Sequence, residues 1–240
     1  MERRTYMPKL KHVPFQFMNE LKDDKQIITL SGSVRKKWYE DDQCIDEASV
    51  HEALNQATTP VIIRLNSPGG DVFEGIAIYN LLKDSERDIT VEVTGVAASA
   101  ASIIAMGANR LVMCKGSSLM IHEASTWAIG NKADIQKTLN ALETIDSSII
   151  SIYVEKTGLD DATLNDYLVN ETWFTADEAV EVGFADEVKK VIEQTAMMNS
   201  TDVEIKLSEE LKNALEEIKE VKALLVEEKP KKLKIFGGNK

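Results

Sequence analysis

Two short runs of β-branched and apolar residues, each followed by a glycine-containing turn and a helical pattern, constrain the fold of this chain most strongly. The runs are residues 60–66 (PVIIRLN) and 89–94 (ITVEVT). Apolar residues after each turn are spaced by three or four positions, as on one face of a helix. Strand, turn and helix repeated in this way predict βαβ units and a mainly parallel sheet. In such a sheet, chemistry is expected at the turns that follow the strands.

Further elements are expected on both sides of these units. The sequence predicts strands over 26–34, 111–113 and 118–121, helices around 47–57 and over 133–156, and a closing apolar segment over 179–188. Apolar residues of the longest helix step by three and four, and Gly158 stands where a helix commonly ends. At about 1.5 Å per residue this helix would be about 36 Å long, so we expect it to project beyond a compact domain.

The length of 240 residues fits one large domain with an appendage. We expect an N-terminal arm over 1–25, a main domain over 26–190 and a C-terminal extension over 191–240. Within the extension, residues 209–228 carry regularly spaced apolar residues amid Glu and Lys, which favours a short coiled-coil or docking helix over a solvated amphipathic tail. The basic residues at the end of the chain are expected to be disordered.

Composition excludes several classes of protein. A hydrophobic content of 43% is normal for a folded domain, and a net charge of −12 argues against nucleic-acid and anionic-membrane partners. Only two cysteines occur, so a disulfide framework is not expected. No signal peptide is visible, and the longest uncharged run, residues 93–109, is too short for a membrane span. The expected location is therefore the cytoplasm.

Residues 66–72 (NSPGGDV) form the turn after the first strand of the pattern. The consecutive glycines Gly69 and Gly70 let the backbone turn sharply and bring amide groups close to a ligand, as in an oxyanion hole. An ordinary Pro-Gly turn is the simpler interpretation when this segment is taken alone.

Ser99 and His122 stand at the ends of two neighbouring predicted strands. Ser99 opens a helix after a strand that ends at a glycine, and flanking alanines leave room for a substrate at its hydroxyl. A serine needs a base to act as nucleophile, and the chain has only three histidines. His12 lies in an irregular segment and His51 in a helix that looks exposed, whereas His122 ends a strand. The alternative is that Ser99 only caps its helix and that His122 is structural.

Four segments of the sequence resemble a known family. Residues 66–75 (NSPGGDVFEG), 95–108 (GVAASAASIIAMGA), 119–125 (LMIHEAS) and 173–188 (WFTADEAVEVGFADEV) are similar to the Clp protease proteolytic subunit family, in that family's order of serine before histidine. The resemblance covers about residues 26–188. It implies an α/β crotonase-like fold.

The resemblance also implies a function, that of a serine endopeptidase. Ser99 would attack the peptide carbonyl, His122 would accept its proton, and the amides of Gly70 and Ala100 would hold the oxyanion. A bound polypeptide would lie extended as a strand beside Gly70. Family members assemble into seven-membered rings, usually two stacked, and the long helix over 133–156 resembles the element by which these rings interlock. Neither a metal nor another cofactor is expected.

The chain departs from the family where a third catalytic residue, an Asp, is expected. Glu171 is the favoured replacement because a carboxylate could orient the imidazole, and Thr172 and Asp166 are alternatives. In addition, Glu123 and Ala124 replace the family's usual Gln-Pro after the histidine.

The termini depart from the family as well, since the C-terminal extension is long and no axial loop is recognisable at the start. This favours a branch without the usual ATPase partner. With its extended C-terminus, the chain is similar to the Clp-like head-maturation proteases of tailed phages and prophages. Such a protease would act on scaffold or capsid proteins in the host cytoplasm.

The sequence leaves two other functions open. An acyl-CoA enzyme of the crotonase group shares the expected fold and uses paired backbone amides without a Ser–His pair. A catalytically inactive ring acting as scaffold or assembly factor would explain the missing Asp. A Ser–Lys signal-peptide peptidase is disfavoured because no membrane segment is visible.

Overall fold

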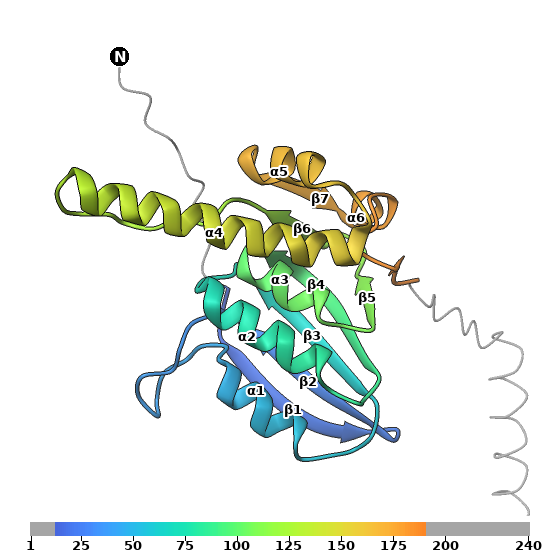
Figure 1. Ribbon diagram of the computed structural model, residues 1–240. Coiled ribbons are helices and arrows are strands. Elements are labelled where there is room, and N and C mark those ends of the chain that lie inside the picture. Colours follow the sequence, from blue (N-terminus) through green and yellow to red (C-terminus); the bar gives the residue numbers. More distant parts are fainter. Residues whose placement is uncertain (1–12, 191–240) are drawn as a thin grey trace, which may run out of the picture. The chain divides into compact units, whose positions relative to one another are not determined.

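The computed structural model describes residues 13–190 (Figure 1). Its elements in chain order are β1 (Gln16–Lys22), β2 (Lys25–Ser31), α1 (Glu47–Leu54), β3 (Val61–Ser67), α2 (Val72–Lys83), β4 (Ile89–Ala98), α3 (Ala100–Met106), β5 (Arg110–Met113), β6 (Ser118–Ile121), α4 (Lys132–Thr157), α5 (Asp161–Val169), β7 (Thr172–Thr175), α6 (Ala176–Glu181) and β8 (Glu187–Val188). The expected C-terminal helix over 209–228 lies outside the described residues.

The strands form one eight-stranded sheet in the order β1-β2-β3-β4-β5-β8, and β6 pairs with β4 and β7 beside this path. Pairings along the path from β2 to β8 are parallel, as is β4 with β6, whereas β1–β2 and β6–β7 are antiparallel. The α/β fold with βαβ units is therefore confirmed.

Helices α1, α2 and α3 lie along one face of the sheet, and α4 crosses beside α3 (Figure 1). In β3 the buried residues Val61, Ile63 and Leu65 alternate with Ile62 and Arg64, so one face of the strand packs against helices. On the opposite face, Glu92 of β4 forms ion pairs with both Arg64 and Lys189.

Helix α4 has clear sequence signals at both ends. Asn131 and Asp134 form a capping box at its start, and Gly158 ends it in the left-handed conformation, as its position predicted. With 26 residues at about 1.5 Å each, α4 is about 39 Å long. Its first turns extend beyond the sheet in Figure 1, which confirms the expected projection.

The expectation of an irregular arm up to residue 25 is wrong for residues 16–22, which form β1. This strand pairs with β2 through a tight hairpin whose turn residues, Asp23 and Asp24, have φ values of 51° and 57°. It is an edge strand with mostly exposed side chains, so it lacks the apolar signal of the inner strands.

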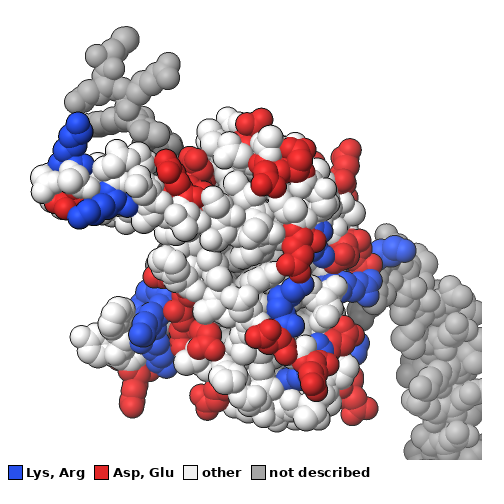
Figure 2. All heavy atoms as spheres, viewed as in Figure 1, with Lys and Arg blue, Asp and Glu red and all other residues white. Residues whose placement is uncertain are grey.

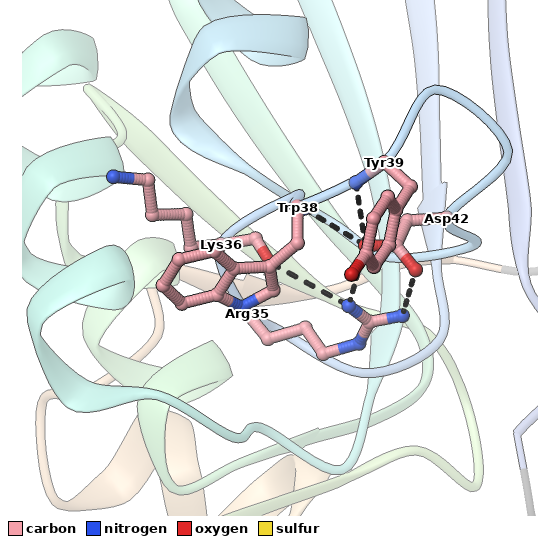
Figure 3. A network of polar contacts seen from close by, with 5 residues as sticks. All are labelled: Arg35, Lys36, Trp38, Tyr39 and Asp42. Atoms are coloured by element: carbon pink, nitrogen blue, oxygen red, sulfur yellow. Dashed lines mark hydrogen bonds and ion pairs between the residues drawn. The ribbon is translucent and has the colours of Figure 1, made fainter.

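The segment between β2 and α1 forms a loop closed by an ion pair (Figure 3). The Arg35 guanidinium donates two hydrogen bonds of 3.1 Å to the Asp42 carboxylate, which also accepts from the backbone amides of Trp38 and Tyr39. Arg35 and these amides hold the pKa of Asp42 well below its ordinary value. At its base, Val34 bridges to Gly70, so this loop is anchored to the glycine turn.

Candidate active site

Ser99 lies at a sharp turn between the end of β4 and the start of α3. Its φ of 55° and ψ of −127° lie outside the regions that non-glycine residues favour. Its amide donates to the carbonyl of Met120 in β6, with a distance of 2.9 Å. Such strain persists only where surrounding contacts fix the backbone, and it is a common feature of reactive serines at strand-to-helix turns.

His122 directly follows β6, which pairs in parallel with the last residues of β4. Because Ala98 is opposite Met120 in this pairing, the residues after the two strands lie close together. The Nε2 atom of His122 is 2.8 Å from Oγ of Ser99, which is hydrogen-bonding distance. The proximity expected from the sequence is therefore confirmed.

The glycine turn lies against Ser99. A Cβ atom on Gly69 would be 2.8 Å from Cβ of Ser99 and 2.9 Å from the amide nitrogen of Ala100, so only glycine fits there. The Val34 bridge uses the carbonyl of Gly69 and the amide of Asp71, and it leaves out the amide of Gly70. The amide of Ala100 is the first of α3, where a helix supplies no acceptor. Among residues 13–190 neither amide has an acceptor, so both are available to bind a ligand.

Replacing Gly70 by alanine is expected to destabilise the fold strongly. The added Cβ would lie 2.0 Å from the carbonyl oxygen of Val34, at a φ of 151° that favours glycine. We expect the free energy of unfolding in urea to fall by about 3 kcal/mol or more. Gly116→Ala is the matched control, because Gly116 also has a positive φ, of 82°, but its Cβ would meet no atom within 4 Å. Equal losses in the two variants would contradict this packing argument.

Within the described residues, none of the three candidates for a third catalytic residue forms a hydrogen bond with the His122 side chain. Within residues 13–190, the Nδ1 atom of His122 makes no hydrogen bond. Glu171 has a φ of 48°, and its carboxylate accepts a long hydrogen bond of 3.4 Å from the indole of Trp173. The hydroxyl of Thr172 donates to the carbonyl of Tyr167, and Asp166 is engaged through its backbone carbonyl. The role assigned to Glu171 stays a prediction.

A residue of α4 that the sequence did not single out holds the segment after His122. The carboxylate of Asp146 accepts a hydrogen bond of 2.7 Å from the amide of Ala124. On the other side, the amide of Glu123 donates to the carbonyl of Leu168 at the end of α5. The chain that replaces the family's Gln-Pro is therefore fixed from both sides.

A pocket of about 410 Å³ opens beside Ser99 and His122. Its wall on α4 is mostly apolar and includes Leu142, Ile145 and Ile149. In Figure 2 the surface between α4 and the starts of α2 and α3 is mostly uncharged. A pocket of this kind suits an apolar side chain of a substrate.

Residues 13–190 contain neither a membrane-spanning helix nor a candidate metal cluster. No helix there is long and apolar enough to cross a membrane. No cluster of three or more His, Cys, Asp or Glu side chains is placed there to bind a metal ion.

The protein has an α/β fold, and its candidate site lies where parallel strands end. The site combines a serine and a histidine in contact with free backbone amides, which are the parts of a serine hydrolase. A family model described as Clp protease matches residues 12–192. The chain therefore belongs to the Clp protease family, and membership implies a peptidase with the family's crotonase-like fold.

Curated relatives agree with this assignment. The chain is 31% identical over 168 residues to ATP-dependent Clp protease proteolytic subunit 1 of Protochlamydia amoebophila, an alignment that covers 68% of this chain and 76% of the relative. It is 29% identical over 175 residues to proteolytic subunit 2 of Treponema denticola, covering 72% and 86%. It is 29% identical over 169 residues to proteolytic subunit 3 of Rhodococcus jostii, covering 68% and 81%.

Proposed function

We propose that this protein is a serine endopeptidase in which Ser99 is the nucleophile and His122 the general base. The observation that carries the proposal is the 2.8 Å contact between Oγ of Ser99 and Nε2 of His122. Membership in the Clp protease family supports it independently of that geometry.

The reaction would proceed in two halves. Oγ of Ser99 attacks the scissile carbonyl carbon while its proton passes to Nε2 of His122. The carbonyl oxygen becomes negatively charged and accepts hydrogen bonds from the amides of Gly70 and Ala100. Collapse of this intermediate breaks the C–N bond, and the amine leaves with the proton from His122. Water, deprotonated by His122, then attacks the carbonyl carbon of the acyl-enzyme. The ester bond breaks, and Ser99 regains its proton from His122.

Glu171 is our proposal for the residue that orients His122, with Thr172 and Asp166 as the alternatives. A carboxylate at Nδ1 would fix the tautomer in which Nε2 can accept a proton, and it would stabilise the imidazolium. The carboxylate of Glu171 would have to leave Trp173 to take this position.

The assembly and the substrates belong to the same proposal. The chain would form a homo-oligomeric ring, heptameric or doubly heptameric, with its serines facing an enclosed chamber. The names of the relatives given above describe them as ATP-dependent. This chain has an extension, residues 193–240, that lies outside the family match. The extension supports our proposal of a phage or prophage protease that processes scaffold or capsid proteins without an ATPase partner.

Incubation of the purified protein with unfolded casein, without nucleotide, tests the function. We expect new peptides in the mass spectrum and no turnover of crotonyl-CoA. An acyl-CoA enzyme would give the opposite pattern. A ring that sediments normally but turns over neither substrate would support the inactive scaffold. The lack of a hydrogen-bond partner at Nδ1 of His122 among residues 13–190 favours that alternative.

A further inference from the structure

Two buried hydroxyl groups lie directly behind Ser99. Ser102 stands one turn further along α3, and Tyr153 reaches it from α4. Their exposed fractions are 0% and 1%, and their hydroxyl oxygens are 2.8 Å apart. Oγ of Ser102 is in turn 2.6 Å from the carbonyl oxygen of Ser99. The proposed mechanism makes no use of this chain of contacts.

The direction of these hydrogen bonds follows from counting protons. A serine hydroxyl has one proton, and the carbonyl of Ser99 can only accept, so Ser102 donates to it. The Ser102 oxygen therefore accepts from Tyr153. Burial raises the pKa of Tyr153, so that its hydroxyl keeps its proton and remains a donor.

The carbonyl of Ser99 belongs to the same planar peptide group as the amide of Ala100. Because that group is rigid and trans, fixing the direction of the carbonyl also fixes the N–H on its opposite side. This N–H is one of the two amides proposed to hold the oxyanion. Hydrogen bonds to the carbonyl also polarise the peptide group and make the N–H a stronger donor.

The backbone around Ser99 needs such restraint. Its φ of 55° is unfavourable for a serine, and strain of this kind relaxes when the contacts around it are removed. The Ser99 amide donates to the Met120 carbonyl, and the Ser99 carbonyl also accepts from the amides of Ser102 at 2.9 Å and Ile103 at 3.4 Å. The Ser102 hydroxyl is the one side-chain donor to this carbonyl within the described residues, and Tyr153 holds that hydroxyl in place.

We propose that Ser102 and Tyr153 are positioning residues that aim the Ala100 amide at the oxyanion, so that α4 sets the geometry of the nucleophile turn. This inference rests on the proposed peptidase function. A buried polar pair that serves only the core would affect stability and leave the chemical step unchanged.

Phosphonylation by a fluorophosphonate probe separates a positioning role of Ser102 and Tyr153 from a purely structural one. Oγ of Ser99 bonds to phosphorus while its proton passes to Nε2 of His122, the P–F bond breaks and fluoride leaves. The phosphoryl oxygen occupies the oxyanion position. The maximal rate of inactivation, kinact, reports the chemical step, and the half-saturating concentration, KI, reports binding of the probe.

We expect kinact to fall about tenfold in Ser102→Ala and about threefold in Tyr153→Phe, with KI within about twofold of wild type. The double variant should resemble Ser102→Ala alone, because Tyr153 acts through Ser102. Ser147→Ala is the control, since this exposed serine of α4 also donates to a backbone carbonyl, at 2.8 Å, but lies away from the site.

Wild-type kinact in both single variants would overturn the inference, as would a change confined to KI or to the thermal midpoint. Midpoints measured in parallel show that each variant is folded at the assay temperature. If Ser102→Ala does not fold, Tyr153→Phe alone decides, because it removes one oxygen and keeps the ring. Failure of the wild type itself to react at Ser99 would instead refute the peptidase function.

Discussion

Replacing Ser99 by alanine is expected to reduce peptide hydrolysis by about 10⁴-fold to 10⁶-fold, to the background of the assay. Without Oγ no acyl-enzyme forms, and His122 has no proton to accept. The free amides of Gly70 and Ala100 remain, so substrate binding should persist. Release of a fluorophore from an internally quenched peptide with an apolar residue at the cleaved bond measures the loss.

The fold should survive this change. Alanine removes a single oxygen, and the backbone of Ser99 remains bonded to Met120 and Ser102. We therefore expect a circular dichroism spectrum equal to that of wild type, and full activity in the control Ser147→Ala. Hydrolysis by Ser99→Ala at a rate within tenfold of wild type would mean that another group attacks the substrate.

Replacing His122 by alanine is expected to lower the turnover number by about 10³-fold to 10⁴-fold. The serine hydroxyl would stay in place but would have no group to accept its proton at 2.8 Å. Because the pocket is lined mainly by other residues, KM should change far less than kcat. Steady-state kinetics on the same quenched peptide separates the two constants.

His51→Ala is the matched control, since this exposed histidine of α1 lies outside the pocket. It should keep wild-type kinetics. Equal background turnover in wild type and His122→Ala would favour the inactive ring scaffold. Wild-type turnover in His122→Ala would exclude His122 as the general base.

Much of this architecture could be predicted because the inner strands have a clear sequence pattern. The β-branched runs that became β3 and β4 are buried on at least one face, and each is followed by a glycine-containing turn. Once two strands are parallel neighbours, the residues that follow them must meet at the same edge of the sheet. The proximity of Ser99 and His122 follows from that rule, whereas the 2.8 Å contact of their side chains is visible only in the structure.

The parts that could not be predicted depend on side-chain direction and on weak local signals. The exposed edge strand β1 shows little apolar pattern, and its turn, Asp23-Asp24, lacks the glycine that usually marks a tight hairpin. Spacing also could not show where the carboxylate of Glu171 points. Tyr153 and Asp146 were overlooked because they lie on a helix whose apolar residues dominate the pattern. A tyrosine in the buried stripe of α4 was the available signal, since a buried phenol needs a hydrogen-bond partner.

Mapping the adduct formed by a fluorophosphonate on the wild-type protein tests the central claim most directly. Tandem mass spectrometry of the digested protein should place a single stoichiometric adduct on Ser99, and Ser99→Ala should remain unmodified. An adduct on a different residue, or none on a protein that cleaves casein, would contradict the assignment of Ser99 as the nucleophile.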